Sequence, residues 1–216
     1  MTSPAACLFD LDGLLLDTEP LHGRAWRQAA RIFGLELSDQ QLLALRGRRR
    51  LDNAGSVIAW IEAAGGTPPN PEQLLAVQQP IARQLLPGAR AMPGAPELLS
   101  RCQKLAIPMA LVTSSTRESA GIKCAPHPWL KQIELMVCGD DSELAEGKPA
   151  PDIFLLAARR LGVAARACWA FEDSPAGAQA ALAAGALVHV LLPDGIDLDH
   201  YPPQVRCLRS LGELEL

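Results

Sequence analysis

The sequence predicts an α/β fold, a doubly wound parallel sheet into which a helical segment is inserted after the first strand. Short, continuously apolar runs alternate with helical stretches over most of the chain, as in sheets covered by helices on both faces. Residues 19–87 break this alternation, because they show helical periodicity and contain no convincing strand. A chain of 216 residues is long enough for one sizeable core and such an insert.

The expected strands are apolar runs without the alternation of half-exposed strands. They are Ala5–Phe9, Ile107–Val112, Ile133–Cys138, Ala167–Phe171 and Ala186–Leu192. Helices are expected after most of them, over Thr116–Cys124, Pro151–Leu161 and Pro175–Ala184. The last of these has a strong start, with Ser174 as N-cap and Pro175 at the first helical position. Alternation of this kind predicts a parallel sheet.

The insert is expected to contain helices over Pro20–Phe33, Asp39–Leu45, Leu51–Ala64 and Glu72–Leu86. Glycine and proline breakers lie on both sides of the last helix, in residues 65–71 and at Pro87-Gly88. We therefore assign residues 1–18 and 88–216 to the core and residues 19–87 to the insert. An insert at this point lies over the carboxyl edge of the sheet, where ligands bind in open α/β folds.

The bulk composition is that of an ordinary soluble protein, with 49% hydrophobic and 20% charged residues. A net charge of −4 gives no sign of nucleic-acid or anionic-membrane binding. The N-terminus does not read as a secretory signal, and no apolar run is long enough to span a bilayer. The six scattered cysteines are expected to be free thiols. We expect a cytoplasmic monomer with neither nucleic-acid nor membrane partners.

Polar side chains follow four of the expected strands. They occur in Phe9-Asp10-Leu11-Asp12-Gly13, Val112-Thr113-Ser114-Ser115, Gly147-Lys148-Pro149 and Phe171-Glu172-Asp173-Ser174. Because the carboxyl ends of parallel strands meet at one edge of the sheet, these groups are expected to share one cleft. Taken alone, each is more often a turn, cap or solvated residue. Their joint occurrence at successive strand ends favours an active site.

Several carboxylates in one cleft repel each other, and their pKa values would rise unless a cation lay among them. Oxygen ligands of this kind suit Mg²⁺. On the other side, Lys148 and the Thr113 hydroxyl could neutralise and hydrogen-bond a phosphoryl group. An aspartate nucleophile, a metal and a lysine together form a coherent set for phosphoryl transfer.

The same residues resemble the four motifs of the haloacid dehalogenase superfamily. The first motif corresponds to residues 8–19, the second to Thr113-Ser114, the third to residues 147–152, and the fourth to Glu172-Asp173-Ser174 with Ala176-Gly177. The resemblance covers essentially the whole chain. It is strongest to the sugar-phosphatase and beta-phosphoglucomutase branch, which has a Rossmann-like core and carries a helical cap where the insert lies.

The resemblance implies a role for each motif residue. Asp10 would attack phosphorus and form an aspartyl-phosphate, while Asp12 would protonate the leaving oxygen and then activate water. The implied ligands of Mg²⁺ are the Asp10 carboxylate, the Asp12 backbone carbonyl, Asp173 and, as a further ligand, Glu172. The implied phosphate-binding residues are Thr113, Ser114 and Lys148.

The cap is expected to select the substrate. Residues 21–26 resemble a mutase segment that places a histidine and a tryptophan near the substrate, which would be His22 and Trp26. A tryptophan in an amphipathic helix is nevertheless more often a core residue. Residues 46–50 contain four arginines at a helix–helix junction, where related caps present a substrate-binding arginine. Arg50 is the best match for anion recognition, although a surface run of arginines is normally just solvated.

We therefore expect a Mg²⁺-dependent phosphatase of a small phosphorylated metabolite, a sugar phosphate. The alternative is a phosphosugar mutase similar to beta-phosphoglucomutase. Such mutases use a cap lysine and a Lys-Asn pair after the second motif. This cap contains no lysine, and Thr116-Arg117 stands in place of the pair. A non-catalytic binding protein on the same fold would be expected to lack a motif residue, and every motif residue is present here.

Overall fold

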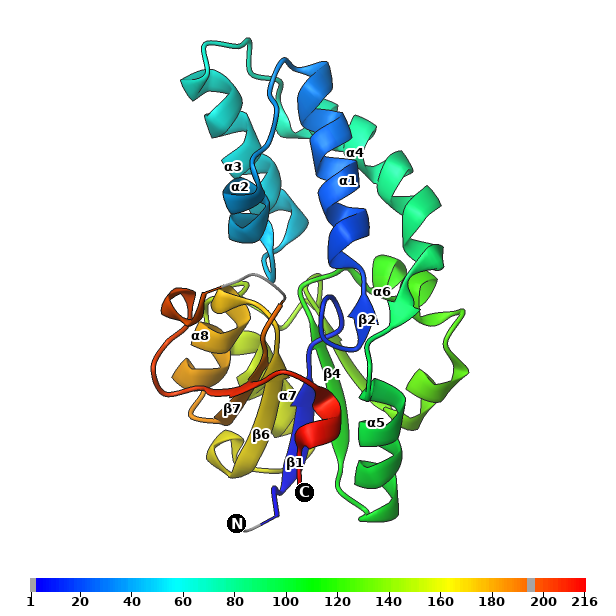
Figure 1. The fold of residues 1–216 in the computed structure, drawn as a ribbon. Coiled ribbons are helices and arrows are strands. Elements are labelled where there is room, and N and C mark those ends of the chain that lie inside the picture. Colours follow the sequence, from blue (N-terminus) through cyan, green and yellow to red (C-terminus); the bar gives the residue numbers. More distant parts are fainter. Residues whose placement is uncertain (1–2, 194–196) are drawn as a thin grey trace.

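The structure is a computed structural model that describes residues 3–193 and 197–216. Its core is a six-stranded sheet of order β5-β4-β1-β6-β7-β8 (Figure 1). The strands are β1 (Ala6–Phe9), β4 (Met109–Thr113), β5 (Leu135–Cys138), β6 (Cys168–Glu172), β7 (Leu187–Leu191) and β8 (Arg206–Leu208). Every pairing is parallel. The predicted doubly wound parallel sheet is confirmed, and the edge strand β8 is added to it.

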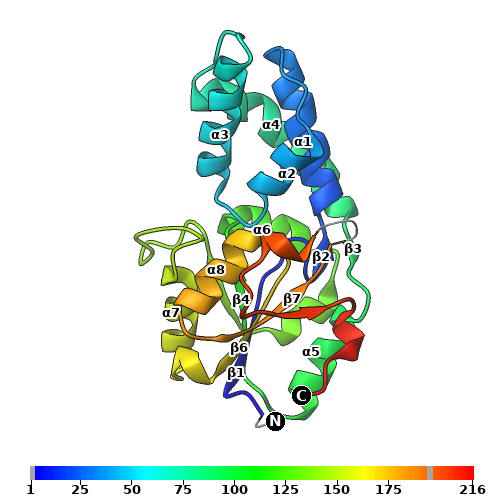
Figure 2. The same ribbon diagram turned by 60° about the vertical axis from the view of Figure 1, so that its left-hand side comes forward.

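Helices cover both faces of the sheet (Figures 1 and 2). They are α5 (Ala95–Lys104), α6 (Arg117–Cys124), α7 (Asp152–Arg160) and α8 (Pro175–Ala183). Short 3₁₀ segments lie at Leu86–Gly88, Pro128–Gln132, Ala165–Ala167, Leu198–His200 and Leu211–Glu213. The sequence predicted α6, α7 and α8 to within two residues at each end, and it did not predict α5.

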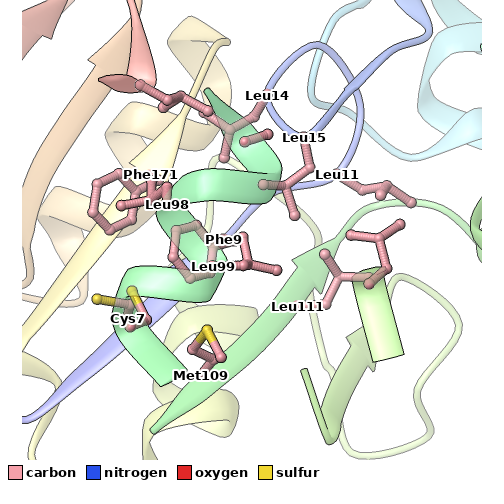
Figure 3. Close-up of a cluster of buried hydrophobic side chains, with 14 of the residues drawn as sticks. Cys7, Phe9, Leu11, Leu14, Leu15, Leu98, Leu99, Met109, Leu111 and Phe171 are labelled. Carbon is pink, nitrogen blue, oxygen red and sulfur yellow. The ribbon is translucent and has the colours of Figure 1, made fainter. Parts of the chain in front are cut away.

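The strands read as continuously apolar because each buries both faces. In β1, Cys7 and Phe9 contact the apolar cluster that includes α5, which Figure 3 shows. The alternate residues Ala6 and Leu8 contact a second apolar cluster, formed largely by residues of α7 and α8. All four side chains are fully buried. This double burial holds the strand ends, and the polar residues that follow them, in fixed positions.

The insert consists of α1 (Glu19–Ile32), α2 (Asp39–Leu45), α3 (Arg50–Ala63) and α4 (Pro71–Leu85), as predicted. These helices form an apolar cluster of their own, which includes Trp26, Leu37, Val57 and Leu74. A capping box starts each of α2 and α4. The side chains of Ser38 and Asn70 each accept a hydrogen bond from the backbone N–H three residues further on, and the glutamine side chain at that position accepts one from the N-cap backbone in return. The helices lie over the carboxyl edge of the sheet (Figure 1) and form the cap.

The chain leaves and re-enters the core through a two-stranded antiparallel ribbon of β2 (Leu16–Asp17) and β3 (Arg90–Ala91). Neither strand was predicted, because two residues are too few to show a period. The limits assigned to core and cap, at 18/19 and 87/88, stay a prediction; residues 1–2 and 194–196 of the assigned core lie outside the described residues. Across residues 3–193 and 197–216, no helix is long and apolar enough to cross a membrane.

One histidine lies inside the core, on β7. His189 is 3% exposed, and its ring lies 5.1 Å from the Phe171 ring and 5.0 Å from the Trp169 ring. Its Nδ1 atom is buried without a hydrogen-bond partner among the described residues. Burial, with the charge of Arg206, lowers the pKa of His189 from 6.5 to about 4. Between pH 6.5 and about 4, the His189 ring is therefore neutral in the folded state but protonated in the unfolded chain.

This arrangement predicts a stability loss in acid. As pH falls from 6.5 toward 4, the unfolded chain takes up a proton that the folded chain does not, so the free energy of unfolding decreases, by about 2 kcal/mol at pH 5. His189→Leu should remove this part of the pH dependence, whereas replacement of the exposed His200 by Leu should not. Urea unfolding of the three proteins at pH 7.5 and pH 5 measures the effect. Parallel pH slopes for wild type and His189→Leu would contradict it.

Candidate active site

The polar residues at the strand ends gather beneath the cap, as the sequence predicted. Asp10 and Asp12 follow β1, Ser114 follows β4, and Glu172 is the last residue of β6. A cavity of about 660 Å³ lies between this edge of the sheet and the cap helices. Its wall includes Asp10, Asp12, Glu19, His22, Trp26, residues 45–51, Ser114 and Ser115. The cavity therefore lies between the motif residues of the core and residues 46–50 of the cap, here called the arginine loop.

Lys148 bridges two carboxylates at the floor of the site. Its fully buried Nζ donates to Asp10 Oδ1 at 2.6 Å, to Glu172 Oε1 at 2.5 Å and to the Val112 carbonyl at 3.1 Å. Burial alone would lower the pKa of Lys148, but the two carboxylates outweigh it and raise this pKa. The lysine is therefore charged and holds Asp10 in place.

This geometry bears on the predicted contact between Lys148 and a phosphoryl group. An ammonium has three hydrogens, and here three acceptors match them. Lys148 does not line the cavity, whereas Asp10, 3% exposed, does. Contact of Lys148 with a phosphoryl oxygen stays a prediction, and it requires that one of the three bonds be exchanged.

Three buried carboxylates could hold a divalent cation. Asp10, Glu172 and Asp173 each present an oxygen, and these oxygens lie within 4.8 Å of one another. Both Asp173 oxygens are buried without a hydrogen-bond partner in the described part of the chain. Burial, together with the nearby carboxylates of Glu19, Asp10 and Glu172, raises the pKa of Asp173 well above its usual range. A bound cation would relieve this uncompensated buried group.

The two fourth-motif carboxylates differ in their surroundings. The Glu172 oxygens are occupied, one by Lys148 at 2.5 Å and the other by the Ser174 hydroxyl at 3.2 Å. Burial raises the pKa of Glu172 to about 7, against the effect of Lys148. Asp173 is approached by the loop after Asp12, where Gly13 has φ +79°; a Cβ there would lie 2.1 Å from Asp173 Oδ2. Of these two carboxylates, Asp173 is the one whose oxygens have no hydrogen-bond partner in the described part of the chain, so it is the better placed to ligate a cation.

Asp12 is held by a dense set of donors. Its Oδ1 accepts from the Thr18 hydroxyl at 2.6 Å and lies 3.2 Å from His22 Nε2, while its Oδ2 accepts from the Ser115 hydroxyl at 3.0 Å. Lys123 Nζ contacts both oxygens, at 2.7 and 2.5 Å. Burial works to raise the pKa of Asp12, but Lys123 and His22 outweigh it and hold this pKa well below its usual range.

The two residues of the predicted second motif have different positions. Thr113 is fully buried, and its hydroxyl accepts from the Ser115 N–H at 3.1 Å. It does not line the cavity, whereas Ser114 does. The Ser114 hydroxyl donates to the Gly47 carbonyl of the cap at 2.7 Å. Contact of Thr113 with a phosphoryl group stays a prediction. Its hydroxyl lies 3.5 Å from Asp12 Oδ2, whereas Ser114 lines the cavity directly.

The cap residues predicted to bind substrate all line the cavity. His22 contacts Asp12, whereas Trp26 is 4% exposed and also belongs to the apolar cluster of the cap. The Nε atom of Arg50 is buried without a hydrogen-bond partner among the described residues, as is that of Arg49. Two unsatisfied guanidinium donors beside a cavity are available to an anion.

The cap touches the core at the arginine loop. Gly47 has φ +71°, and a Cβ at this position would lie 2.0 Å from the Ser174 hydroxyl. Arg46 in turn pairs with Glu19 on α1, with 3.2 Å between Nε and Oε2. Only a glycine allows the loop to come this close to the fourth motif. The loop is thus positioned to place its arginines over the cavity.

Four residues of the site were given no role from the sequence, although three of them lie within the segments that were singled out. Thr18, Glu19, Ser115 and Lys123 all contact the motif residues or line the cavity. For Lys123 a signal was present, because it lies three residues after the buried Ala120 on α6 and is itself fully buried. A lysine on the apolar face of a short helix is unusual, and only four lysines occur in the chain.

Comparisons with known proteins agree with this arrangement. The family model of haloacid dehalogenase-like hydrolases matches residues 4–185. A Drosophila melanogaster protein named "Probable pseudouridine-5'-phosphatase" is 37% identical over 87% of this chain and 81% of its own length. The fructose-1-phosphate phosphatase YqaB of Escherichia coli is 34% identical over 84% of this chain and 93% of its own.

Among solved structures, a beta-phosphoglucomutase from Clostridium difficile is similar with a TM-score of 0.84. It covers 99% of this chain and 94% of its own at 21% identity, which shows a common fold with a cap. The matched motifs, the cavity beneath the cap and the named phosphatases among its relatives agree. The chain belongs to the haloacid dehalogenase-like hydrolase family and is a phosphomonoester hydrolase.

Proposed function

We propose that this enzyme is a Mg²⁺-dependent phosphatase of a small sugar phosphate, with Asp10 as its nucleophile. The observation that carries the proposal is the position of Asp10. It lines the cavity, Lys148 holds one of its oxygens, and it shares a cation-sized group of carboxylates with the unpartnered Asp173. An E. coli relative named as a fructose-1-phosphate phosphatase supports a sugar ester as substrate.

In the proposed reaction, an Asp10 oxygen attacks phosphorus and the ester P–O bond breaks. The leaving oxygen takes a proton from Asp12, which Lys123 and His22 keep ionised in the substrate-free enzyme and which must therefore take up this proton as the substrate binds. The products of this step are the free alcohol and an aspartyl-phosphate. Asp12 then removes a proton from water, the water oxygen attacks phosphorus, and the bond between phosphorus and Asp10 breaks. The products are inorganic phosphate and the regenerated Asp10. Ser114 and, after exchange of one bond, Lys148 would hold the phosphoryl oxygens.

The proposed ligands of the metal are the carboxylates of Asp10 and Asp173, the Asp12 backbone carbonyl and Glu172. When bound, Mg²⁺ supplies charge neutralisation between the nucleophile and the phosphoryl oxygens. The oxygen-only donor set fits Mg²⁺, which prefers a few carboxylates and retains positions for water and phosphate. The proposal also retains a cytoplasmic location, with which six free thiols are in accord, and a monomeric state.

The second candidate is a phosphosugar mutase. The arginines over the cavity favour it, because they could hold the second phosphate of a sugar bisphosphate. The absence of lysine from the cap disfavours it. With beta-glucose 1-phosphate and a catalytic bisphosphate, a mutase would form glucose 6-phosphate faster than inorganic phosphate, because a closed cap returns the phosphoryl group to sugar instead of water.

The test is a phosphate-release screen over phosphorylated metabolites, with coupled detection of glucose 6-phosphate beside inorganic phosphate in the glucose 1-phosphate reaction. We expect phosphate release to dominate and sugar phosphates to be the best substrates. If glucose 6-phosphate forms faster than inorganic phosphate, the enzyme is a mutase and the phosphatase proposal is wrong. Release from nucleotides alone would overturn the sugar-phosphate assignment.

A prediction for Arg50 tests the cap. Arg50→Ala should raise KM for the best substrate roughly ten- to a hundredfold, the effect of losing a charge-assisted hydrogen bond. It should change p-nitrophenyl phosphate hydrolysis little, because the distal nitro group of this ester carries no net charge and accepts hydrogen bonds only weakly. Arg24→Ala, at an exposed position on α1, is the matched control. Equal KM changes for both substrates would show that Arg50 does not read the distal end.

A further inference from the structure

Lys123 is a buried cation whose partners all belong to the active site. Its side chain is fully buried, and its Nζ lies 2.7 and 2.5 Å from the two Asp12 oxygens and 2.6 Å from the Ser115 hydroxyl. Asp12 and Ser115 both line the cavity. The three donor hydrogens of the ammonium are thus matched by three oxygens of the site.

A role in packing alone does not explain this residue. Lys123 lies on the inner face of α6, close in sequence to the buried Ala120, where an apolar side chain would fill the space without a charge. Burial of an ammonium is costly unless its charge is paired. The buried charge on α6 is therefore that of Lys123, and its acceptors are Asp12 and the Ser115 hydroxyl. This hydroxyl in turn donates to Asp12.

We propose that Lys123 is a positioning residue that fixes the orientation of the Asp12 carboxylate toward the cavity. One ammonium in contact with both carboxylate oxygens restrains rotation of the group. The hydroxyls of Thr18 and Ser115 hold one oxygen each. Without Lys123, the carboxylate keeps these hydroxyls, the contact with His22 at 3.2 Å and that with the Thr113 hydroxyl at 3.5 Å. Each of these partners contacts one oxygen only, so the carboxylate loses the donor that spans both.

Orientation matters because Asp12 must exchange a proton with the leaving oxygen of the ester. Proton transfer requires hydrogen-bond reach in the reacting geometry. A misdirected Asp12 should slow esters whose leaving group needs a proton and spare those whose leaving group departs as a stable anion. This inference rests on the proposed function, specifically on Asp12 as the acid, so the experiment separates the two.

The test compares kcat/KM for two substrates, an alkyl phosphate from the screen and p-nitrophenyl phosphate. This constant reports steps up to departure of the leaving group, so it is independent of later hydrolysis of the aspartyl-phosphate. Lys123→Met should lower it about 30- to 100-fold for the alkyl ester and less than about threefold for the nitrophenyl ester. Lys131→Met, at an exposed position, should change neither. Equal losses for both esters, or none, would overturn the positioning role.

Asp12→Asn is measured alongside. If it shows no discrimination between the two esters, the proposed acid role of Asp12 fails, and the role of Lys123 fails with it. If Asp12→Asn discriminates and Lys123→Met does not, only the Lys123 inference is wrong. Should Lys123→Met not fold, Lys123→Gln replaces it, because its amide can still donate to one carboxylate oxygen. For Lys123→Gln, we expect the loss in kcat/KM to be about five- to tenfold greater for the alkyl ester than for the nitrophenyl ester. Equal losses for both esters would again overturn the inference.

Discussion

Asp10→Asn is expected to lower turnover of the best substrate by at least about 10³-fold, the scale of losing covalent catalysis. The substitution keeps the volume of the side chain but removes the negative charge that attacks phosphorus. Folding should survive, because a neutral amide reduces the repulsion among the buried carboxylates near Asp173, and its oxygen can still accept from Lys148. Phosphate release at saturating substrate and thermal unfolding of both proteins measure the two effects.

The matched control for this variant is Asp17→Asn, an exposed aspartate in the adjoining ribbon. It should leave turnover within a few-fold of wild type. Acid quenching during turnover should trap phosphate on the wild-type protein and none on Asp10→Asn. Activity of Asp10→Asn close to that of wild type would remove the covalent step from the mechanism, and with it the reason to assign Asp10 the leading role.

The sequence predicted the parallel sheet because its strands bury both faces and therefore read as uninterrupted apolar runs. Strand β8 gave no such signal, since two of its three residues are exposed at the sheet edge. For α5 the signal was present in the spacing of Leu98, Leu99 and Cys102, which all enter the core. Of the residues between 88 and the strand at Ile107, only membership of the core was predicted.

The site was predictable where it depends on strand ends, which the topology brings together whatever the details of packing. It was not predictable where it depends on which way a side chain points. Thr113 is the last residue of β4 and is fully buried, whereas Ser114 and Ser115, which follow the strand, both line the cavity. The contact between Lys123 and Asp12 joins residues 111 positions apart, and no spacing rule connects them.

Removal of divalent metal is the second change expected to have a large effect. EDTA should abolish phosphate release, Mg²⁺ should restore it, and Ca²⁺ should inhibit. The reason lies in Asp173, which has no hydrogen-bond partner for either oxygen in the described part of the chain and faces Asp10 and Glu172. Ca²⁺ requires longer bonds and more ligands than Mg²⁺, so it would misplace Asp10 relative to phosphorus. Full activity in metal-free buffer would remove the metal from the mechanism.

Unfolding measurements test the same site without relying on activity. Mg²⁺ bound to the folded state alone should raise the melting temperature progressively with concentration, as linkage requires. Asp173→Asn should abolish that rise. In metal-free buffer this variant should be at least as stable as wild type. Burial and the neighbouring carboxylates make a negative charge on Asp173 unfavourable, and the substitution removes that charge. A metal-dependent rise that persists in Asp173→Asn would place the cation elsewhere, whereas a variant less stable than metal-free wild type would mean that Asp173 supports the fold in its own right.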